Sequence, residues 1–193
     1  MVAFLLSGQG GNFVQAPNIL ALTGAPGTGK TTVGSLLGAA GIGVVSVESL
    51  AETFDCIGDA DPSDGARPID LDVLCPILED KWSARPGETT LIDGHLSHLL
   101  PVDCIIILRC QPTVLQDRLV ERGYEDDKIS QNVDWEILGG AWNELDELLP
   151  LIEFDTSTVS ADSIVESILG WIADDFKPER PTNPIDWVDR GEI

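Results

Sequence analysis

Residues Ile19 to Thr32 read ILALTGAPGTGKTT and are the segment most indicative of the fold class. Its residues Gly24, Gly29, Lys30 and Thr31 have the G-x-x-x-x-G-K-[ST] spacing of a phosphate-binding loop. The apolar run 19–23 before the loop predicts a buried strand, and residues 30–40 after it predict a helix. A strand, a glycine-rich turn and a helix in this order are the context that such a loop requires, so we expect the chain to bind a nucleoside triphosphate.

The chemistry of the loop predicts its ligand contacts. Glycines let the backbone turn so that successive N–H groups point at one anion, and the helix N-terminus adds partial positive charge. Lys30 can reach the β- and γ-phosphates, and the Thr31 hydroxyl can hold Mg²⁺. The predicted ATP-binding set is Gly27, Thr28, Gly29, Lys30, Thr31 and Thr32.

The charge of the chain is unusual for its size. Its 193 residues carry 33 acidic and 11 basic side chains, a net charge of −22, and only four of the bases are lysines. Such a surface needs salt to screen its self-repulsion, which favours a cytoplasmic protein of an organism with molar internal salt. No basic stripe is present, which argues against direct nucleic-acid binding, whereas a basic protein partner would fit.

The cysteines and the N-terminal residues argue against a zinc protein, a disulfide-linked protein and a membrane or secreted protein. The four cysteines form no C-x-x-C pair, so neither a zinc site nor a disulfide framework is indicated. The apolar run 2–6 is too short for a membrane span and has no preceding positive charge, as a signal peptide would. We therefore expect a cytoplasmic protein without a membrane segment.

From residue 19 the chain alternates strand and helix. Predicted strands are 19–23, 42–47, 89–93, 103–109 and 151–155, and predicted helices are 30–40, 69–82, 112–122, 127–149 and 161–175. Short apolar strands are typical of a parallel sheet covered by helices on both faces. We expect a leader of uncertain structure at 1–18, one domain at 19–176, and an extended tail at 177–193 that could dock Trp187 on the domain.

Asp93 and His95 form a second candidate motif. Asp93 ends a predicted strand, and the carboxyl ends of parallel strands face the ligand crevice. Asp93 would therefore lie beside Thr31 and hold Mg²⁺ through water. His95 could orient an attacking water or an acceptor group, or it could simply begin a helix. A metal pair of His95 with His98 is a weaker alternative, because no further histidine or nearby thiol completes it.

Arginines are candidates for stabilising a transferring phosphoryl group. Arg109 ends the fourth predicted strand at the ligand edge and is predicted to bind ATP together with the loop residues. Arg118 and Arg122 lie one turn apart on the next helix. The alternative for these two is ion pairing with neighbouring acids, Asp117, Glu121 or Glu125. Arg67, in a loop rich in Asp, Gly and Pro, could bind an acceptor phosphate.

With these motifs assembled, the chain resembles the adenylate kinase isoenzyme 6 family, the Fap7-like proteins of archaea and eukaryotes. The matching segments are the loop 24–32, Asp93-Gly94-His95, Leu108-Arg109, residues 114–124 (VLQDRLVERGY) and residues 128–137 (KISQNVDWEI).

The resemblance implies a P-loop fold of the nucleoside monophosphate kinase type, with a five-stranded parallel sheet. It also implies a monophosphate-binding part at 47–82 and a short helical lid at 112–132 that carries Arg118 and Arg122. The implied activities are adenylate kinase and slow ATPase with MgATP, and the implied role is small ribosomal subunit maturation with a ribosomal protein.

Two main functions stay open at the level of sequence. One is a transferase that moves the γ-phosphoryl group of ATP to AMP, with Lys30, Asp93, His95, Arg118 and Arg122 as catalytic residues. The other is a nucleotide-gated assembly ATPase in which transfer to AMP is incidental. A kinase for another small acceptor is a third possibility.

Overall fold

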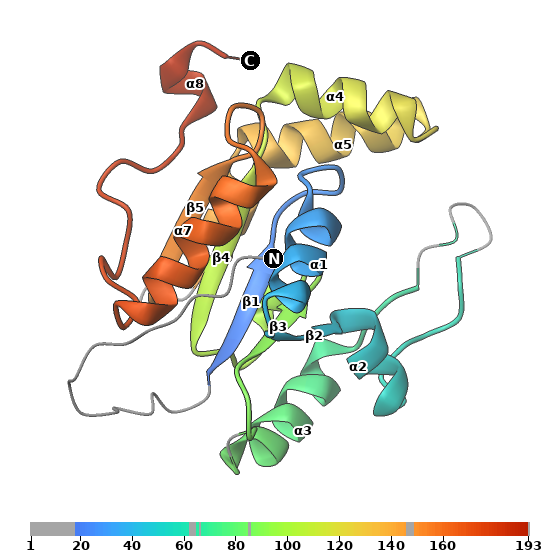
Figure 1. Ribbon diagram of the computed structural model, residues 1–193. Coiled ribbons are helices and arrows are strands. Elements are labelled where there is room, and N and C mark those ends of the chain that lie inside the picture. The colour runs from blue at the N-terminus through green and yellow to red at the C-terminus, as the bar shows by residue number, and fades with distance from the viewer. Residues whose placement is uncertain (1–17, 62–64, 66, 85, 146–148, 193) are drawn as a thin grey trace.

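A computed structural model describes residues 18–61, 65, 67–84, 86–145 and 149–192 of the chain. Five parallel strands form one sheet in the order β2-β3-β1-β4-β5 (Figure 1). The strands are β1 Ile19–Thr23, β2 Gly43–Ser46, β3 Thr90–Asp93, β4 Cys104–Arg109 and β5 Leu151–Asp155. The predicted five-stranded parallel sheet is confirmed, and nearly all of the predicted leader lies outside the described residues.

Helices cover both faces of the sheet, as the continuous apolar strands require. On one face, α1 (Lys30–Ala39) and α7 (Ala161–Ala173) pack against a core that includes Leu22, Ile106 and Trp171. On the other face, α2 (Val47–Thr53), α3 (Leu71–Ser83) and the one-turn helix η1 (Ser97–Leu99) lie over a second core. Because β1 and β4 are central and buried on both sides, every residue of these two strands is buried.

Two helices lie side by side beyond the carboxyl end of β4 (Figure 1). They are α4 (Pro112–Glu121) and α5 (Asp126–Ile137), and they contain the segment expected to be a lid. Leu115, Leu119 and Ile129 pack there against Ala25 of the phosphate-binding loop. The apolar contacts of the two helices therefore reach the loop itself.

The prediction of one helix over 127–149 is wrong. Helix α5 ends at Ile137, Gly139 adopts a left-handed φ of 65°, and a separate helix α6 runs from Gly140 to Asn143. A Cβ atom at Gly140 would lie 2.1 Å from the indole of Trp135, so only glycine fits there. The apolar spacing continued past the break and concealed it, because Ala141, Leu145 and Leu149 still pack on the core.

Helix α2 was not expected from the sequence. It begins directly after β2, where the Ser46 side chain accepts a hydrogen bond from Ser49 N and caps the helix. Val47 and Ala51 face the core. This early start of α2 brings its N-terminus to the edge of the sheet where the strands end.

The C-terminal segment 177–192 is not simply extended. It returns along β5, where Leu151 N donates to Glu179 O over 2.7 Å, and ends in the short helix α8 (Trp187–Arg190) (Figure 1). Trp187 is completely buried. Across the described residues, none of the helices has both the length and the apolar character needed to span a membrane.

Candidate active site

The phosphate-binding loop connects β1 to α1 in a conformation that only glycine supports at its first position. Gly24 has φ +135°, and a Cβ atom there would lie 2.2 Å from the Leu108 carbonyl oxygen of β4. Thr28 donates from Oγ1 to Ala25 O over 2.8 Å and closes the turn. Gly29 precedes α1 with φ 97° and offers no capping side chain, so the first N–H groups of α1 are left for an anion.

Lys30 lies at the start of α1 and folds back over the loop. Its Nζ donates to Gly24 O over 2.6 Å and to Ala25 O over 3.0 Å. Burial lowers the pKa of Lys30 to about 8, the nearby Asp93 carboxylate opposes this shift, and the Arg122 guanidinium adds to it. The buried ammonium group of Lys30 would be stabilised by a nearby negative group, such as the phosphates of a nucleoside triphosphate.

Asp93 and Thr31 line the same cleft as Lys30. Asp93 pairs in register with Leu22 at the end of β3, so its side chain emerges beside the loop. Partial burial raises the pKa of the Asp93 carboxyl, and Lys30 pulls that pKa down. Carboxylate and hydroxyl oxygens suit Mg²⁺, which keeps waters and phosphate oxygens as its other ligands. The described chain has no cluster of three or more His, Cys, Asp or Glu for a metal, so an ion at this site would need those additional ligands.

His95 is exposed at the wall of this cleft, beyond the tight turn at Gly94. A Cβ atom at Gly94 would lie 2.6 Å from Val47 Cγ2, so the turn packs directly on α2. Partial desolvation and then the charge of Lys30 lower the pKa of His95. His98 is instead buried and bonded to Thr23 and Glu144, an arrangement that does not fit the alternative of a His95–His98 metal pair.

The two lid arginines have different surroundings. Arg118 donates from Nη1 to Gly27 O (3.3 Å) and Thr156 Oγ1 (3.1 Å), and from Nη2 to Thr156 O (2.9 Å). Arg122 is exposed at the cleft, and no hydrogen bond or ion pair engages it within the described residues. Neither arginine forms an ion pair with an acid of the described chain, which disfavours the surface ion-pair alternative.

The cleft has a volume of about 640 Å³ and brings together most of the predicted site. Arg67 lines it with Lys30, although Arg67 Nη1 lies 2.6 Å from Glu52 Oε1 and 3.9 Å from Glu48 Oε1. A second hollow of about 450 Å³ lies against the loop and is lined by Thr28, Arg118 and the apolar side chains of Val159 and Ile164.

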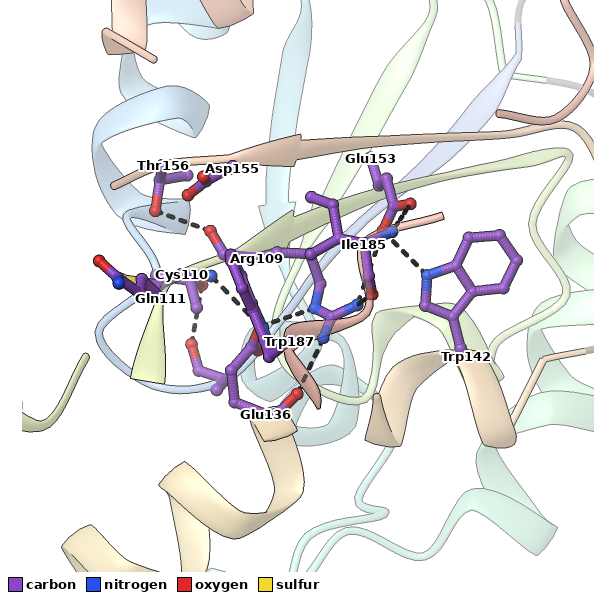
Figure 2. Close-up of polar contacts among 12 residues, drawn as sticks. Arg109, Cys110, Gln111, Glu136, Trp142, Glu153, Asp155, Thr156, Ile185 and Trp187 are labelled. Carbon is purple, nitrogen blue, oxygen red and sulfur yellow. Dashed lines mark hydrogen bonds and ion pairs between the residues drawn. The ribbon is translucent and has the colours of Figure 1, made fainter. Parts of the chain in front are cut away.

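The predicted nucleotide contact of Arg109 does not fit its position. Its guanidinium is buried, with Nε 2.6 Å from Glu136 Oε1 and Nη2 2.8 Å from Glu136 O (Figure 2). Its Nη1 also donates to Ile185 O over 3.1 Å and lies 3.6 Å from Glu153 Oε2. Arg109 lines neither hollow at the loop. A buried guanidinium must be paired, and the acidic partners of Arg109 are Glu136 of α5 and Glu153 of β5.

Sequence reasoning missed the partners that complete this cluster. Glu136 Oε1 accepts from Cys110 N (3.2 Å) and Trp187 Nε1 (2.8 Å) in addition to Arg109 (Figure 2). Burial raises the pKa of Glu136, and Arg109 opposes that shift. Glu136 lies in segment 128–137, which carries the family resemblance, but that segment indicates no partner for it, and the 27-residue separation from Arg109 hid the pair.

Thr156 was also missed, although it connects Arg109 to the lid. Its N and Oγ1 both donate to Arg109 O over 2.9 Å, while the same residue accepts from Arg118. The backbone of Arg109 therefore helps to hold a lid arginine, although its side chain faces away.

Comparison with known proteins places these features in a family. A family model described as an AAA domain matches residues 20–139. A protein of Pyrococcus abyssi (strain GE5 / Orsay) named "Putative adenylate kinase" is 36% identical over 171 residues, which are 88% of this chain and 91% of that protein. The chain belongs to the family of these archaeal proteins. Another member, from Halobacterium salinarum (strain ATCC 29341 / DSM 671 / R1) and of the same name, is 31% identical over 88% of this chain and 98% of its own length.

Solved structures confirm the fold. A shikimate kinase from Acinetobacter baumannii superposes with a TM-score of 0.55 at 13% identity, covering 82% of this chain and 94% of that one. A gluconokinase from Sinorhizobium meliloti 1021 gives a TM-score of 0.54 at 17% identity, with coverage of 84% and 95%. At these identities the likeness extends to the fold alone.

Proposed function

We propose that the protein transfers the γ-phosphoryl group of ATP to AMP and hydrolyses ATP slowly when no acceptor is bound. The proposal rests on one cleft that is large enough to have two parts, one for ATP and one for the phosphoryl acceptor. The phosphate-binding loop and Lys30 line one part of it, and Arg67 with the N-terminus of α2 lines another. The name of the archaeal relatives supports the same reading.

Each residue has a role that follows from its place. Lys30 would neutralise the β- and γ-phosphates, and Arg122, the unengaged arginine, would stabilise charge that develops during transfer. Arg118 would hold the lid against the loop through Gly27 and Thr156 and turn toward the phosphates on closure. The purine of ATP would enter the second hollow, where Val159 and Ile164 offer apolar surface.

Mg²⁺ would be held by Thr31 and, through water, by Asp93, and it would neutralise charge on the phosphates when bound. Asp93 itself would position that water shell, because its carboxylate projects from the end of β3. His95 would orient an attacking water or the acceptor by a hydrogen bond from its exposed ring.

One observation favours the ATPase as the physiological activity. Arg67 is already paired with Glu52 and lies near Glu48, so an acceptor phosphate would have to displace those carboxylates. In that case the protein would be a cytoplasmic assembly factor whose acidic surface binds a basic small-subunit ribosomal protein. The net charge of −22 and the family resemblance support such a partner.

The deciding experiment is a product assay with MgATP and a panel of nucleoside monophosphates in molar KCl, with and without the candidate ribosomal protein. ADP formed in proportion to added AMP supports the transferase, and ADP formed only with inorganic phosphate supports the ATPase. Failure to form ADP under every condition contradicts both functions.

Two variants separate the roles within the site. Asp93→Asn should abolish both transfer and hydrolysis and weaken Mg²⁺-dependent binding. His95→Gly should leave MgATP affinity within about threefold but depress hydrolysis strongly, and transfer less so, because AMP brings its own nucleophile. Normal hydrolysis in His95→Gly would remove His95 from the mechanism.

A further inference from the structure

A chain of hydrogen bonds behind the second motif runs from the buried Thr23 through the buried His98 to the exposed Glu144. Thr23, the last residue of β1, is fully buried, and its Oγ1 lies 3.0 Å from the His95 carbonyl oxygen and 2.8 Å from His98 Nδ1. On the far side of the ring, His98 Nε2 lies 3.0 Å from Glu144 Oε2. The chain of contacts thus links the segment after α6, through η1, to the end of β1 and the exposed residue His95.

The contact between Thr23 and His95 extends the pairing of β1 with β3. Gly94 N donates to Leu22 O over 3.2 Å, and the Thr23 hydroxyl makes the next link one residue further along both segments. Beyond this link the chain turns into η1. This hydrogen bond from Thr23 Oγ1 to His95 O, called the tie below, therefore joins the end of β1 directly to the backbone of His95.

Counting protons shows that the three contacts depend on one another. A carbonyl and a carboxylate can only accept, and a hydroxyl has one proton to donate. If Thr23 donates to His95 O, the contact with Nδ1 must come from an N–H of His98. The contact with Glu144 requires an N–H at Nε2 as well. All three bonds can exist together only when the His98 ring carries both protons.

When the His98 ring is neutral, one of these three bonds is lost, and the Glu144 carboxylate determines which one. A lone pair at Nε2 would face the Glu144 carboxylate, so the remaining proton stays on Nε2. Nδ1 then becomes an acceptor and draws the Thr23 hydroxyl away from His95 O. Burial lowers the pKa of His98, and the bond to Glu144 and a contact with the His95 carbonyl oppose this shift. The other titratable groups nearby are His95 itself and Lys30, whose charge acts on His95.

We propose that Thr23 and His98 are positioning residues, in which the Thr23 hydroxyl ties the His95 backbone to β1 and the proton on His98 determines whether the tie is made. The tied state holds the His95 ring toward the γ-phosphate, and the released state lets it move. Neither residue lines the cleft within the described chain, so both act through His95. The expected effect on hydrolysis rests on the proposed function.

The hydrogen bonds can be tested without any activity. His95 and His98 are the two histidines of the chain, so ¹⁵N-histidine NMR gives two ring systems, which His95→Gln assigns. Neutral His98 should carry its proton on Nε2, and Thr23→Val should shift the Nδ1 signal while Thr23→Ser restores it. The proposal is overturned if the neutral His98 ring carries its proton on Nδ1, or if the chemical shift of Nδ1 is the same in Thr23→Val as in the wild type.

The activity test compares variants that lock each state. Thr23→Val removes the tie and should lower hydrolysis about tenfold or more at low pH, where His98 is protonated, while MgATP affinity stays within about threefold. At pH 8, where a neutral His98 already releases the tie in the wild type, the loss should be smaller. Thr23→Ser keeps the hydroxyl and serves as the matched control. His98→Asn places an amide N–H near the position of Nδ1, so hydrolysis at pH 8 should equal or exceed that of the wild type and vary less with pH.

Urea denaturation of each variant separates positioning from folding. If hydrolysis per folded molecule at low pH, where His98 is protonated, is the same in Thr23→Val and Thr23→Ser, the tie has no role. The double variant Thr23→Val/His98→Asn should hydrolyse no faster than Thr23→Val alone, because His98 acts through the hydroxyl. A wild-type protein that neither hydrolyses ATP nor transfers phosphate would refute the proposed function, and the NMR result would still decide on the tie.

Discussion

Replacing Arg109 by methionine tests whether this arginine stabilises the fold or binds nucleotide. Methionine keeps much of the length of the side chain and removes the charge. In the cluster of Figure 2, Arg109 pairs with Glu136 at 2.6 Å and lies 3.6 Å from Glu153. Arg109→Met would leave two buried carboxylates without their cation.

The expected loss of stability follows from that burial. Breaking a buried ion pair by removing one partner costs about 3–5 kcal/mol. For a chain of this length that corresponds to a decrease in Tm of roughly 10 °C. Because burial already raises the pKa of Glu136, the loss should shrink as the pH falls, since a protonated Glu136 no longer needs a cation. Arg109→Met/Glu136→Gln should recover much of the loss, about 2 kcal/mol or more, because Gln still accepts from Cys110 N and Trp187 Nε1.

The assay is urea unfolding in molar KCl followed by tryptophan fluorescence, with MgATP affinity measured on the folded variant. Arg190→Met is the matched control: Arg190 is exposed, its guanidinium lies 5.4 Å from the Trp187 ring, and its removal should cost only about 0.5–1 kcal/mol. A variant Arg109→Met with wild-type stability and MgATP affinity reduced more than about tenfold would refute the structural role and restore the nucleotide contact.

Three further predictions use the charges of the protein. Lowering KCl from 1 M to 0.1 M lengthens the Debye length from about 3 Å to about 10 Å, so the Tm measured by circular dichroism should fall; an unchanged Tm contradicts the salt requirement inferred from the net charge of −22. Lys30 has a pKa near 8 without nucleotide, and a bound triphosphate should raise it, so calorimetry at pH 8 in two buffers should show proton uptake and ATP affinity should decrease above pH 8; binding that releases no proton and takes up none would contradict this. Arg122→Ala should leave the Tm within about 1 °C and lower turnover a hundredfold or more, whereas Arg118→Ala should lower both, because only Arg118 is bonded to Gly27 and Thr156; equal Tm losses in the two variants would show that Arg122 has a structural partner.

Several parts of the protein could be predicted from sequence because their causes are local. The spacing of Gly24, Lys30 and Thr31 specifies a turn whose glycines are needed for the backbone itself. Continuous apolar runs specify buried parallel strands, and all five were found within one residue of the predicted bounds. The position of Asp93 at a strand end also follows, since parallel strands end at one edge.

The break between α5 and α6 could not be read from the apolar pattern. The spacing of Val133, Ile137 and Ala141 is that of one helix, and it continues across the break. The break lies at Gly139, which adopts a left-handed φ of 65°, and the Trp135 indole then occupies the space that a side chain at residue 140 would need. Such a contact depends on a rotamer, which periodicity does not encode.

The phosphate-binding loop, the parallel sheet and the acidic surface can be predicted from sequence, since each depends on neighbouring residues or on composition. The partners of the charged side chains, in contrast, become visible only in the folded chain. Arg109 and Arg118 look alike in sequence, yet one is buried against Glu136 and the other reaches the loop through Gly27. A charged group in a protein interior must lie beside a partner, and which partner is near is set by packing between segments far apart in the chain. The same holds for His98, whose two ring nitrogens contact Thr23 and Glu144, 75 and 46 residues away.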